Sequence, residues 1–142
     1  VLGSGLPLVS ASLTDALSGH QLAPPCLEVE LPGVRVGILG VVDAQAFMAV
    51  PATAYQGVRV ATVAASLRPH LARLRSRCEL VAVLTNLGPE GDTDLAEELP
   101  DIDVIFVYGE EGSLNPAFTR GQFFSRLAER LVATFASAHP AG

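Results

Sequence analysis

Lysine is absent from this sequence of 142 residues, so all nine of its basic residues are arginines. Fifteen acidic residues give the chain a formal net charge of −6 at pH 7. Phosphate binding requires a clustered basic surface, and this charge balance therefore argues against nucleic acid as the main partner. One local basic cluster exists, and its helical spacing indicates a solvated helix face: Arg68, Arg73, Arg75 and Arg77.

Long hydrophobic runs are also lacking. No run approaches the roughly 20 apolar residues that a membrane-spanning helix needs, so we expect no membrane span. The first residues contain neither an initiator methionine nor a basic segment. This pattern argues against a signal peptide and favours the interior of a longer protein or a processed chain.

Cysteine and histidine are scarce. The two cysteines, Cys26 and Cys78, lie far apart in the sequence and match no metal-binding spacing. Each begins or precedes an apolar run, so we expect buried free thiols. The three histidines follow no predicted strand, and we interpret them as surface residues without a role: His20, His70 and His139.

Apolar residues are plentiful, at 49% of the chain, which is enough to bury the core of one domain spanning residues 1–142. The turn signal Pro32-Gly33 predicts a β-hairpin between two of the apolar runs. Asp43 to Gly57 is irregular. Strand-like patterns cover residues 6–13, 26–31, 34–42, 79–85 and 102–108.

Helical patterns lie between and after these strands. Apolar residues three and four apart predict a helix over 61–77, in which Pro69 indicates either a start near Ser66 or a kink. A short helix is predicted over 93–99, with Asp92 as its N-cap. The apolar face of the first helix consists of Val63, Leu67, Leu71 and Leu74.

The order of strands and helices predicts an α/β fold with a mainly parallel sheet, helices packed on it and one β-hairpin near the N-terminus. An amphipathic helix over 120–138 ends the domain. We expect the following residues to lie in adjacent parallel strands: Val81, Val83, Val104, Ile105 and Val107.

Two glycine-bearing loops follow the strands predicted at 79–85 and 102–108. They are Thr85-Asn86-Leu87-Gly88 and Tyr108-Gly109-Glu110-Glu111-Gly112. Sites in open α/β sheets lie at the carboxyl ends of strands, so we predict that any site of this chain involves these loops.

Four segments carry a resemblance: PLVSASL (7–13), LPGVRVGILGVVD (31–43), ELVAVLTNLGPEGDTDLAEELPDID (79–103) and VIFVYGEEGS (104–113). In this order they resemble the second half of a metallophosphoesterase domain of the 5′-nucleotidase and cyclic-phosphodiesterase group, over residues 6–113. Ser12 replaces an asparagine of that family's first strand. The first-half motifs D-x-H, G-D and G-N-H-[ED] do not occur in this chain.

The resemblance implies a site with two divalent metals, which activate water and clamp a phosphate ester. The second half of the domain would supply three histidine ligands, and this chain has Asn86, Gly109 and Glu111 at those positions. Only Asn86 and Glu111 retain an oxygen that could bind a metal, and an amide is a weak substitute for imidazole. We therefore predict no catalytic residue, no metal and no cofactor. The loops of the former site hold Thr85, Asn86, Gly88, Tyr108, Gly109, Glu110 and Glu111.

Other acidic groups have simpler interpretations. Helix capping and a solvated face explain the cluster at 92–98 better than a mononuclear Mg²⁺ or Ca²⁺ site does. Glu110 and Glu111 resemble a catalytic carboxylate pair, but adjacent loop residues rarely face one substrate. The cluster at 92–98 contains Asp92, Asp94, Glu97 and Glu98.

We interpret the chain as a non-catalytic binding or structural module with a protein partner or a second copy, and Phe123 as a possible partner contact. One alternative is a fragment of a metal-dependent phosphoric ester hydrolase whose metal-bearing first half lies elsewhere. A second alternative is a generic doubly wound α/β domain. The family resemblance implies a periplasmic or extracellular location.

Overall fold

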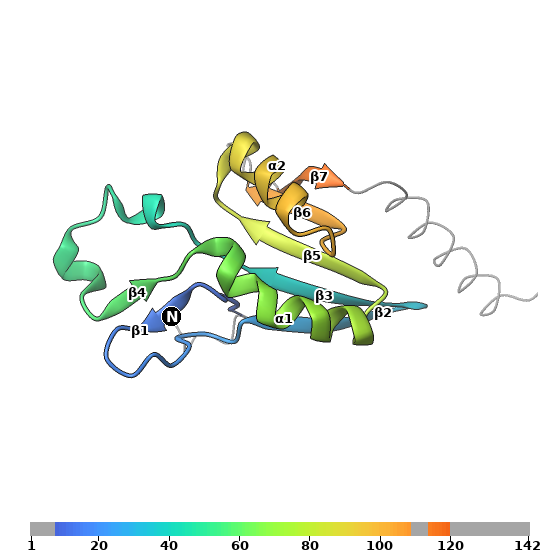
Figure 1. The fold of residues 1–142 in the computed structure, drawn as a ribbon, viewed down its shortest axis with the longest axis horizontal. Helices are drawn as coiled ribbons and strands as arrows, with labels where there is room; N and C mark the ends of the chain where they lie inside the picture. The colour runs from blue at the N-terminus through green and yellow to red at the C-terminus, as the bar shows by residue number, and fades with distance from the viewer. Residues whose placement is uncertain (1–7, 109–113, 120–142) are drawn as a thin grey trace, which may run out of the picture.

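The computed structural model describes residues 8–108 and 114–119, and the structural statements below concern these residues. Their main sheet has the strand order β2-β3-β5-β6-β7 (Figure 1). A second, two-stranded sheet pairs β1 (Leu13–Asp15) with β4 (Val58–Val60). The main-sheet strands are β2 (Cys26–Leu31), β3 (Val34–Gly40), β5 (Leu80–Thr85), β6 (Val104–Tyr108) and β7 (Leu114–Thr119).

Helices connect the strands on the carboxyl side of β3 and β5. The described α-helices are α1 (Val63–Arg77) and α2 (Gly88–Glu98). Between β3 and β4 the chain forms two short 3₁₀ helices, η1 (Ala44–Phe47) and η2 (Ala52–Tyr55). These two helices, together with β1 and β4, extend away from the main sheet (Figure 1).

The centre of the main sheet is parallel and its edges are antiparallel. Strand β5 pairs in parallel with both β3 and β6, whereas β2 and β7 pair antiparallel with their neighbours. The mainly parallel sheet predicted from the sequence is therefore correct only for the three central strands. Within these strands the register opposes Val83 to Ile105 and Ala82 to Val104, which confirms the predicted adjacency of β5 and β6.

The predicted hairpin is present as β2 and β3, joined at Pro32 and Gly33. Gly33 has a φ of 78°, a left-handed conformation that residues with a Cβ adopt at a cost. The glycine at this turn thus allows two registered strands to meet after only two intervening residues.

Helix α1 spans Val63–Arg77, which agrees with the helix predicted over 61–77, and the alternative of a start near Ser66 is wrong. Pro69 lies inside the helix, where its ring nitrogen has no hydrogen to donate to the preceding turn. Burial of an apolar face outweighs this local loss, since helical stability in proteins comes mainly from packing. The buried residues are those that the spacing predicts: Val63, Leu67, Leu71 and Leu74.

Helix α2 begins at Gly88, five residues before the predicted start, and the prediction of Asp92 as N-cap is wrong. Gly88 has a φ of 83°, and Pro89 lies in the first turn, where a proline's fixed φ suits a helix. Asp92 instead occupies the middle of the helix and is buried. The segment before residue 93 has few apolar side chains, so periodicity alone did not reveal this first turn.

The predicted strand at 6–13 is wrong over residues 8–12, which form no regular strand. Ser12 uses its hydroxyl both to donate to the carbonyl of Val42 (2.8 Å) and to accept from the amide of Val42 (2.9 Å). Such side-chain bonds to the backbone compete with ladder pairing. Regular pairing begins only at Leu13, in β1.

Strand β7 was not predicted, and its Asn115 and Pro116 are residue types that are typical of turns. Pro116 pairs with Phe106 at a register irregularity between β6 and β7. Proline is tolerated on an edge strand, where its missing amide hydrogen disrupts no ladder on the open side. The predicted helix over 120–138, with Phe123, lies outside the described residues.

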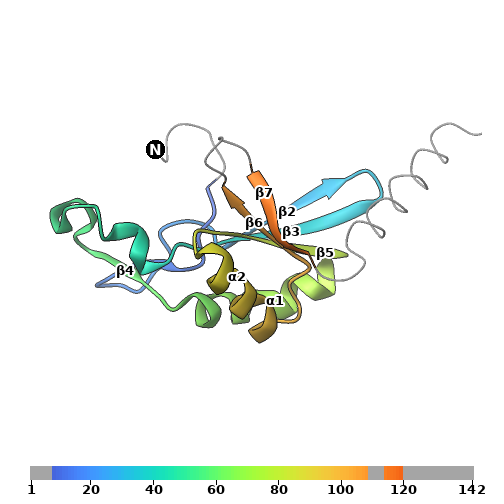
Figure 2. The same ribbon diagram turned by 90° about the horizontal axis from the view of Figure 1, so that it is seen from above.

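The two faces of the main sheet differ in what covers them. Both α-helices lie on one face, which Figure 2 shows from above. Strand residues Leu39, Val83 and Ile105 pack there with the helices, whereas a second cluster on the other face contains strand residues only. The alternative of a doubly wound domain, with helices on both faces, therefore does not describe residues 8–108 and 114–119.

None of the helices formed by the described residues has the length and apolar character that crossing a bilayer requires.

Candidate functional site

The loops after β3 and β5 meet at the carboxyl edge of the main sheet. The amide of Val41 donates to the carbonyl of Leu84 (3.0 Å), which continues the parallel pairing past the end of β3. Two residues farther along, the amide of Asp43 donates to Oδ1 of Asn86 (2.9 Å). The Asn86 side chain thus holds the two strand ends together across 43 residues of sequence.

This bond determines what Asn86 can offer a ligand. Its Oδ1 is the amide atom that could coordinate a metal, and a backbone amide already occupies one side of that oxygen. The side chain of Asn86 is exposed to solvent, at the predicted edge of the sheet. The arrangement resembles a structural link between loops more closely than a prepared ligand.

Thr85 and Asp92 form a second link behind this loop. The Thr85 hydroxyl lies 2.5 Å from Oδ1 of Asp92, and the Asp92 residue is only 1% exposed. Burial raises the pKa of the Asp92 carboxyl above its usual value, and the hydrogen bond from Thr85 opposes this effect. Oδ2 of Asp92 has no hydrogen-bond partner among the described residues.

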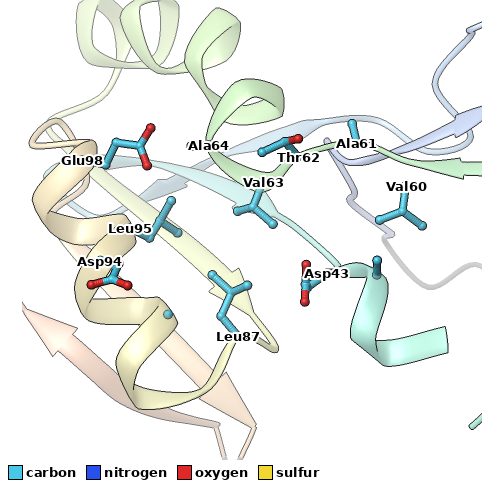
Figure 3. A pocket seen from close by; sticks show the side chains of 12 residues that line it. Asp43, Val60, Ala61, Thr62, Val63, Ala64, Leu87, Asp94, Leu95 and Glu98 are labelled. Atoms are coloured by element: carbon cyan, nitrogen blue, oxygen red, sulfur yellow. The ribbon is translucent and has the colours of Figure 1, made fainter. Parts of the chain in front are cut away.

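A pocket with a volume of about 390 Å³ lies beside the loop, between the start of α1 and one side of α2 (Figure 3). Asp94 and Glu98 lie along α2 on one side of the pocket, and Asp43 lies opposite them. Leu87 and Leu95 give it an apolar wall. The Glu98 carboxylate also binds Arg68 of α1 (2.8 Å), so among the described residues Asp43 and Asp94 are the acidic side chains of the pocket that form no ion pair.

Sequence reasoning placed Asn86 and Thr85 at this edge of the sheet but did not find the pocket. The signal available was Asp43, the acidic residue that directly follows the apolar run 34–42. The sequence predicted this helix only from residue 93. The position of α2 relative to Asp43 and β3 was therefore not predictable.

Some of the remaining predicted site residues lie within the described part of the chain, and the others lie outside it. Thr85 pairs with Val107 in the parallel register, so Tyr108 ends β6 next to the loop of Asn86. Gly88 starts α2. Gly109, Glu110 and Glu111 lie outside the described residues. Within residues 8–108 and 114–119, no group of three or more His, Cys, Asp or Glu side chains is arranged to hold a metal ion.

The acidic cluster of α2 is not the uniform solvated face that its sequence suggested. Asp92 is buried, so its prediction as part of a solvated face is wrong. Asp94, Glu97 and Glu98 are exposed. The prediction of a solvated face is thus correct for three of the four residues.

The arginines of α1 were predicted to form a solvated face, but they contact side chains of other elements. Arg75 reaches the buried carboxylate of Asp103, which also accepts from the amide of Val81 (2.9 Å). The other arginines make surface contacts with Glu98 (Arg68), Glu28 (Arg77) and Sγ of Cys26 (Arg73). The solvated-face interpretation is therefore wrong for Arg75.

Both cysteines are free thiols. Cys78 is buried as predicted, and burial raises the pKa of its thiol; Cys26 is only half-buried. His20 is exposed in the loop after β1, and His70 lies half-buried on α1, where desolvation lowers its pKa. Neither histidine lies at the sheet edge occupied by Asn86, and His139 lies outside the described residues.

No protein-family profile and no curated protein sequence matches the chain significantly. Solved structures do resemble it. The sulfate thiohydrolase SoxB of Thermus thermophilus has a TM-score of 0.64 and 21% identity, over 71% of this chain and 19% of that protein. The calcineurin-like phosphoesterase YfkN of Bacillus subtilis has a TM-score of 0.60 and 19% identity, over 74% and 37%.

The NAD nucleotidase of Haemophilus influenzae is similar as well, with a TM-score of 0.55 and 19% identity, over 75% of this chain and 19% of that protein. The chain thus spans between about a fifth and somewhat more than a third of the length of these proteins. At such identities the likeness shows the fold alone. The described fold is therefore that of one part of the 5′-nucleotidase and calcineurin-like phosphoesterase structures.

Proposed function

We propose that this chain is a non-catalytic binding or structural module built on a metallophosphoesterase-like scaffold. The observation that carries the proposal is the bond between Oδ1 of Asn86 and the amide of Asp43. Asn86 stands where the family resemblance implies a histidine ligand, and here its oxygen joins two loops. Scaffold likeness does not imply activity, because function depends on the side chains of the site.

The neighbouring polar groups support the same proposal. Asp92 is bound to Thr85 within the protein, and Glu98 is bound to Arg68. Gly109, at a second ligand position, has no side chain that could bind a metal. Too few strong ligands remain for two divalent ions, which prefer imidazole and carboxylate groups in such sites.

Metal binding tests the proposal directly. After incubation with Mn²⁺ or Zn²⁺ and removal of loosely bound metal, elemental analysis of the wild-type chain should show less than about one ion per chain. Hydrolysis of bis(p-nitrophenyl) phosphate should stay at the rate of the metal-containing buffer. Two ions per chain with sub-micromolar affinity would overturn the proposal.

A matched pair of variants at position 86 makes the result specific. Asn86→Ala removes the bond to Asp43 and should lower thermal stability without changing metal content. Asn86→His restores an imidazole at the position implied by the resemblance. If this single variant gained bound metal and hydrolytic activity above the buffer rate, the other ligands would be present, which would contradict the statement that too few strong ligands remain.

A second candidate function rests on the coverage of the solved structures. Because the chain spans 19% of SoxB and 37% of YfkN, it corresponds to a piece of a longer fold. In this alternative the chain is part of a metal-dependent phosphohydrolase in the periplasm or outside the cell, and another segment supplies most ligands. The intact mass of the native protein, set against its coding sequence, distinguishes the two: a much larger native protein with first-half ligand motifs favours the enzyme.

A further inference from the structure

The chain between β3 and β4 is a long excursion that contains no buried residue. Every residue from 42 to 62 is half-buried or exposed, and neither η1 nor η2 contributes a buried side chain to the core. Figure 1 shows these two 3₁₀ helices extending away from the main sheet. Long connections of this kind are uncommon in compact domains and usually functional. Residues 44–58, which we call the arm, are therefore a candidate interaction surface.

The arm is mostly apolar and carries no charge. It is the longest run of the sequence without an acidic or basic side chain. Met48 is 83% exposed and Val50 is 38% exposed. Single exposed apolar side chains are common on protein surfaces, whereas exposed apolar residues gathered in one segment mark a contact with another molecule. The composition of the arm thus favours a protein contact over a solvated loop.

Contacts within the arm order it before any partner binds. The rings of Phe47 in η1 and Tyr55 in η2 lie 5.1 Å apart between centroids and are tilted by 53° to each other. At the base of the arm, the carboxylate of Asp43 accepts from the amide of Gln45 (3.4 Å) and caps η1. A segment that is already ordered loses less conformational entropy on binding, so its apolar surface contributes more of its burial to affinity.

A second exposed segment, the turn of residues 15–20, adjoins the arm. The amide of Ala16 donates to the carbonyl of Gly57 (2.8 Å), which joins the turn to the end of the arm. Leu17 in this turn is 98% exposed, whereas the carboxylate of Asp15 accepts hydrogen bonds from within the turn. The arm has 15 residues and the turn has 6. Their combined size is comparable to the roughly 20–30 residues that each partner contributes to a standard interface.

We propose that the arm and the adjoining turn dock on the same surface of a second copy of this chain. In a two-fold dimer a patch meets its own copy, so it must be complementary to itself. An uncharged apolar patch meets this requirement, whereas like charges placed opposite each other repel. Because each chain carries a formal net charge of −6, two copies approach most easily through the uncharged arm. An anionic membrane would instead attract basic residues, and the arm contains none.

Sedimentation of the full chain tests the proposal, with EDTA present so that metal at the strand-end loops cannot contribute. Between about 1 and 100 µM protein we expect a shift from monomer to dimer. Met48→Glu places a charge in the contact and should weaken dimerisation at least about tenfold. Leu31→Glu is the matched control, because Leu31 is also an exposed apolar residue (44%) but lies on β2. This control should dimerise like the parent chain.

Hydrogen exchange at the two ends of this concentration range locates the contact. Peptides that cover residues 44–58 should exchange more slowly at high concentration, and peptides that cover β2 should not change. A parent chain that stays monomeric throughout, equal weakening by both variants, or protection only outside the arm and the turn would each overturn the proposal. If Met48→Glu does not fold, judged by circular dichroism, Val50→Glu replaces it. Binding of two metal ions would contradict the proposed function but would leave this dimer unaffected.

Discussion

Asn86, Asp92 and Ser12 are polar side chains that bind other segments of their own chain near the ends of strands. Asn86 accepts from Asp43, Asp92 accepts from Thr85, and Ser12 bonds twice to the backbone of Val42. Within the part of the chain that the structure describes, such bonds occupy polar atoms that a ligand at this edge of the sheet could otherwise use. They also fix loops that lack regular pairing, and this is the structural role that the residues perform.

Asp92 gives a prediction about the dependence of stability on pH. Burial raises the pKa of its carboxyl in the folded protein. Such a group stabilises the fold fully below its unfolded pKa, near 3.9, and this contribution is lost as the pH rises through the folded pKa. Asp92→Asn cannot ionise, so we expect its thermal midpoint to exceed that of wild type at neutral pH.

Thermal melting between about pH 4 and pH 8 measures the effect, and the advantage of Asp92→Asn should shrink toward the acidic end. Asp94→Asn is the control, because Asp94 lies on the same helix and is exposed. A midpoint for Asp92→Asn below that of wild type at every pH would show that the ionised carboxylate stabilises the fold.

At the scale of elements, the parallel pairing of β5 and β6 supports the core beneath the helices. Ile105 is completely buried, in the same cluster as Leu67 and Leu95 of the two helices. Ile105→Ala should therefore reduce the free energy of unfolding by about 2–5 kcal/mol, through lost burial and the cavity left behind. Urea unfolding measures this, and Leu27→Ala at the exposed edge should have a smaller effect.

A reduction for Ile105→Ala below about 0.5 kcal/mol would contradict its position at the centre of the core, since even mild truncations of buried residues exceed this value. The comparison with Leu27→Ala guards against a general effect of shortening a strand residue, because both variants lose an aliphatic side chain from the main sheet.

Apolar periodicity predicted the strands near 26–31, 34–42, 79–85 and 102–108, together with the buried face of α1. It failed where polar or backbone interactions decide the structure. The first turn of α2 depends on Gly88 and Pro89, and the irregular path before Leu13 depends on the Ser12 hydroxyl. The edge strand β7 contains a proline that a sequence pattern assigns to a turn.

The candidate site was likewise predictable only in part. The position of Asn86 after an apolar run was predictable, because sites follow strands at the carboxyl edge of a sheet. Its partner, the amide of Asp43, was not predictable, because this backbone group lies 43 residues away and depends on strand order. Residues distant in sequence that meet through topology leave no local pattern.

At the scale of the whole molecule, the two faces of the main sheet differ among the described residues. Helices cover one face of the main sheet, and the opposite face is apolar. Sheets with parallel central strands are normally covered on both faces. What covers the second face therefore determines whether this chain is independent or a piece of a larger assembly.

The outer strand of the sheet has a further consequence. Strand β2 lies at an edge, where unpaired backbone groups can template the addition of a foreign strand and lead to aggregation. Two carboxylates occupy this strand: Glu28 binds Arg77 and Glu30 binds Arg35, each at 2.6 Å. Charges on an edge strand oppose such stacking, so we expect these surface pairs to limit aggregation even if they add little to stability.

Replacing both carboxylates, as Glu28→Val and Glu30→Val together, should leave the fold intact and increase light scattering during incubation near the melting temperature. A matched double variant on α2, Glu90→Val with Glu97→Val, removes the same charge from a helix and leaves β2 unchanged. If the two double variants scattered light equally, net charge rather than the β2 edge would govern solubility. A markedly faster rise for the β2 variant would identify that edge as the place where this protein guards against amyloid-like growth.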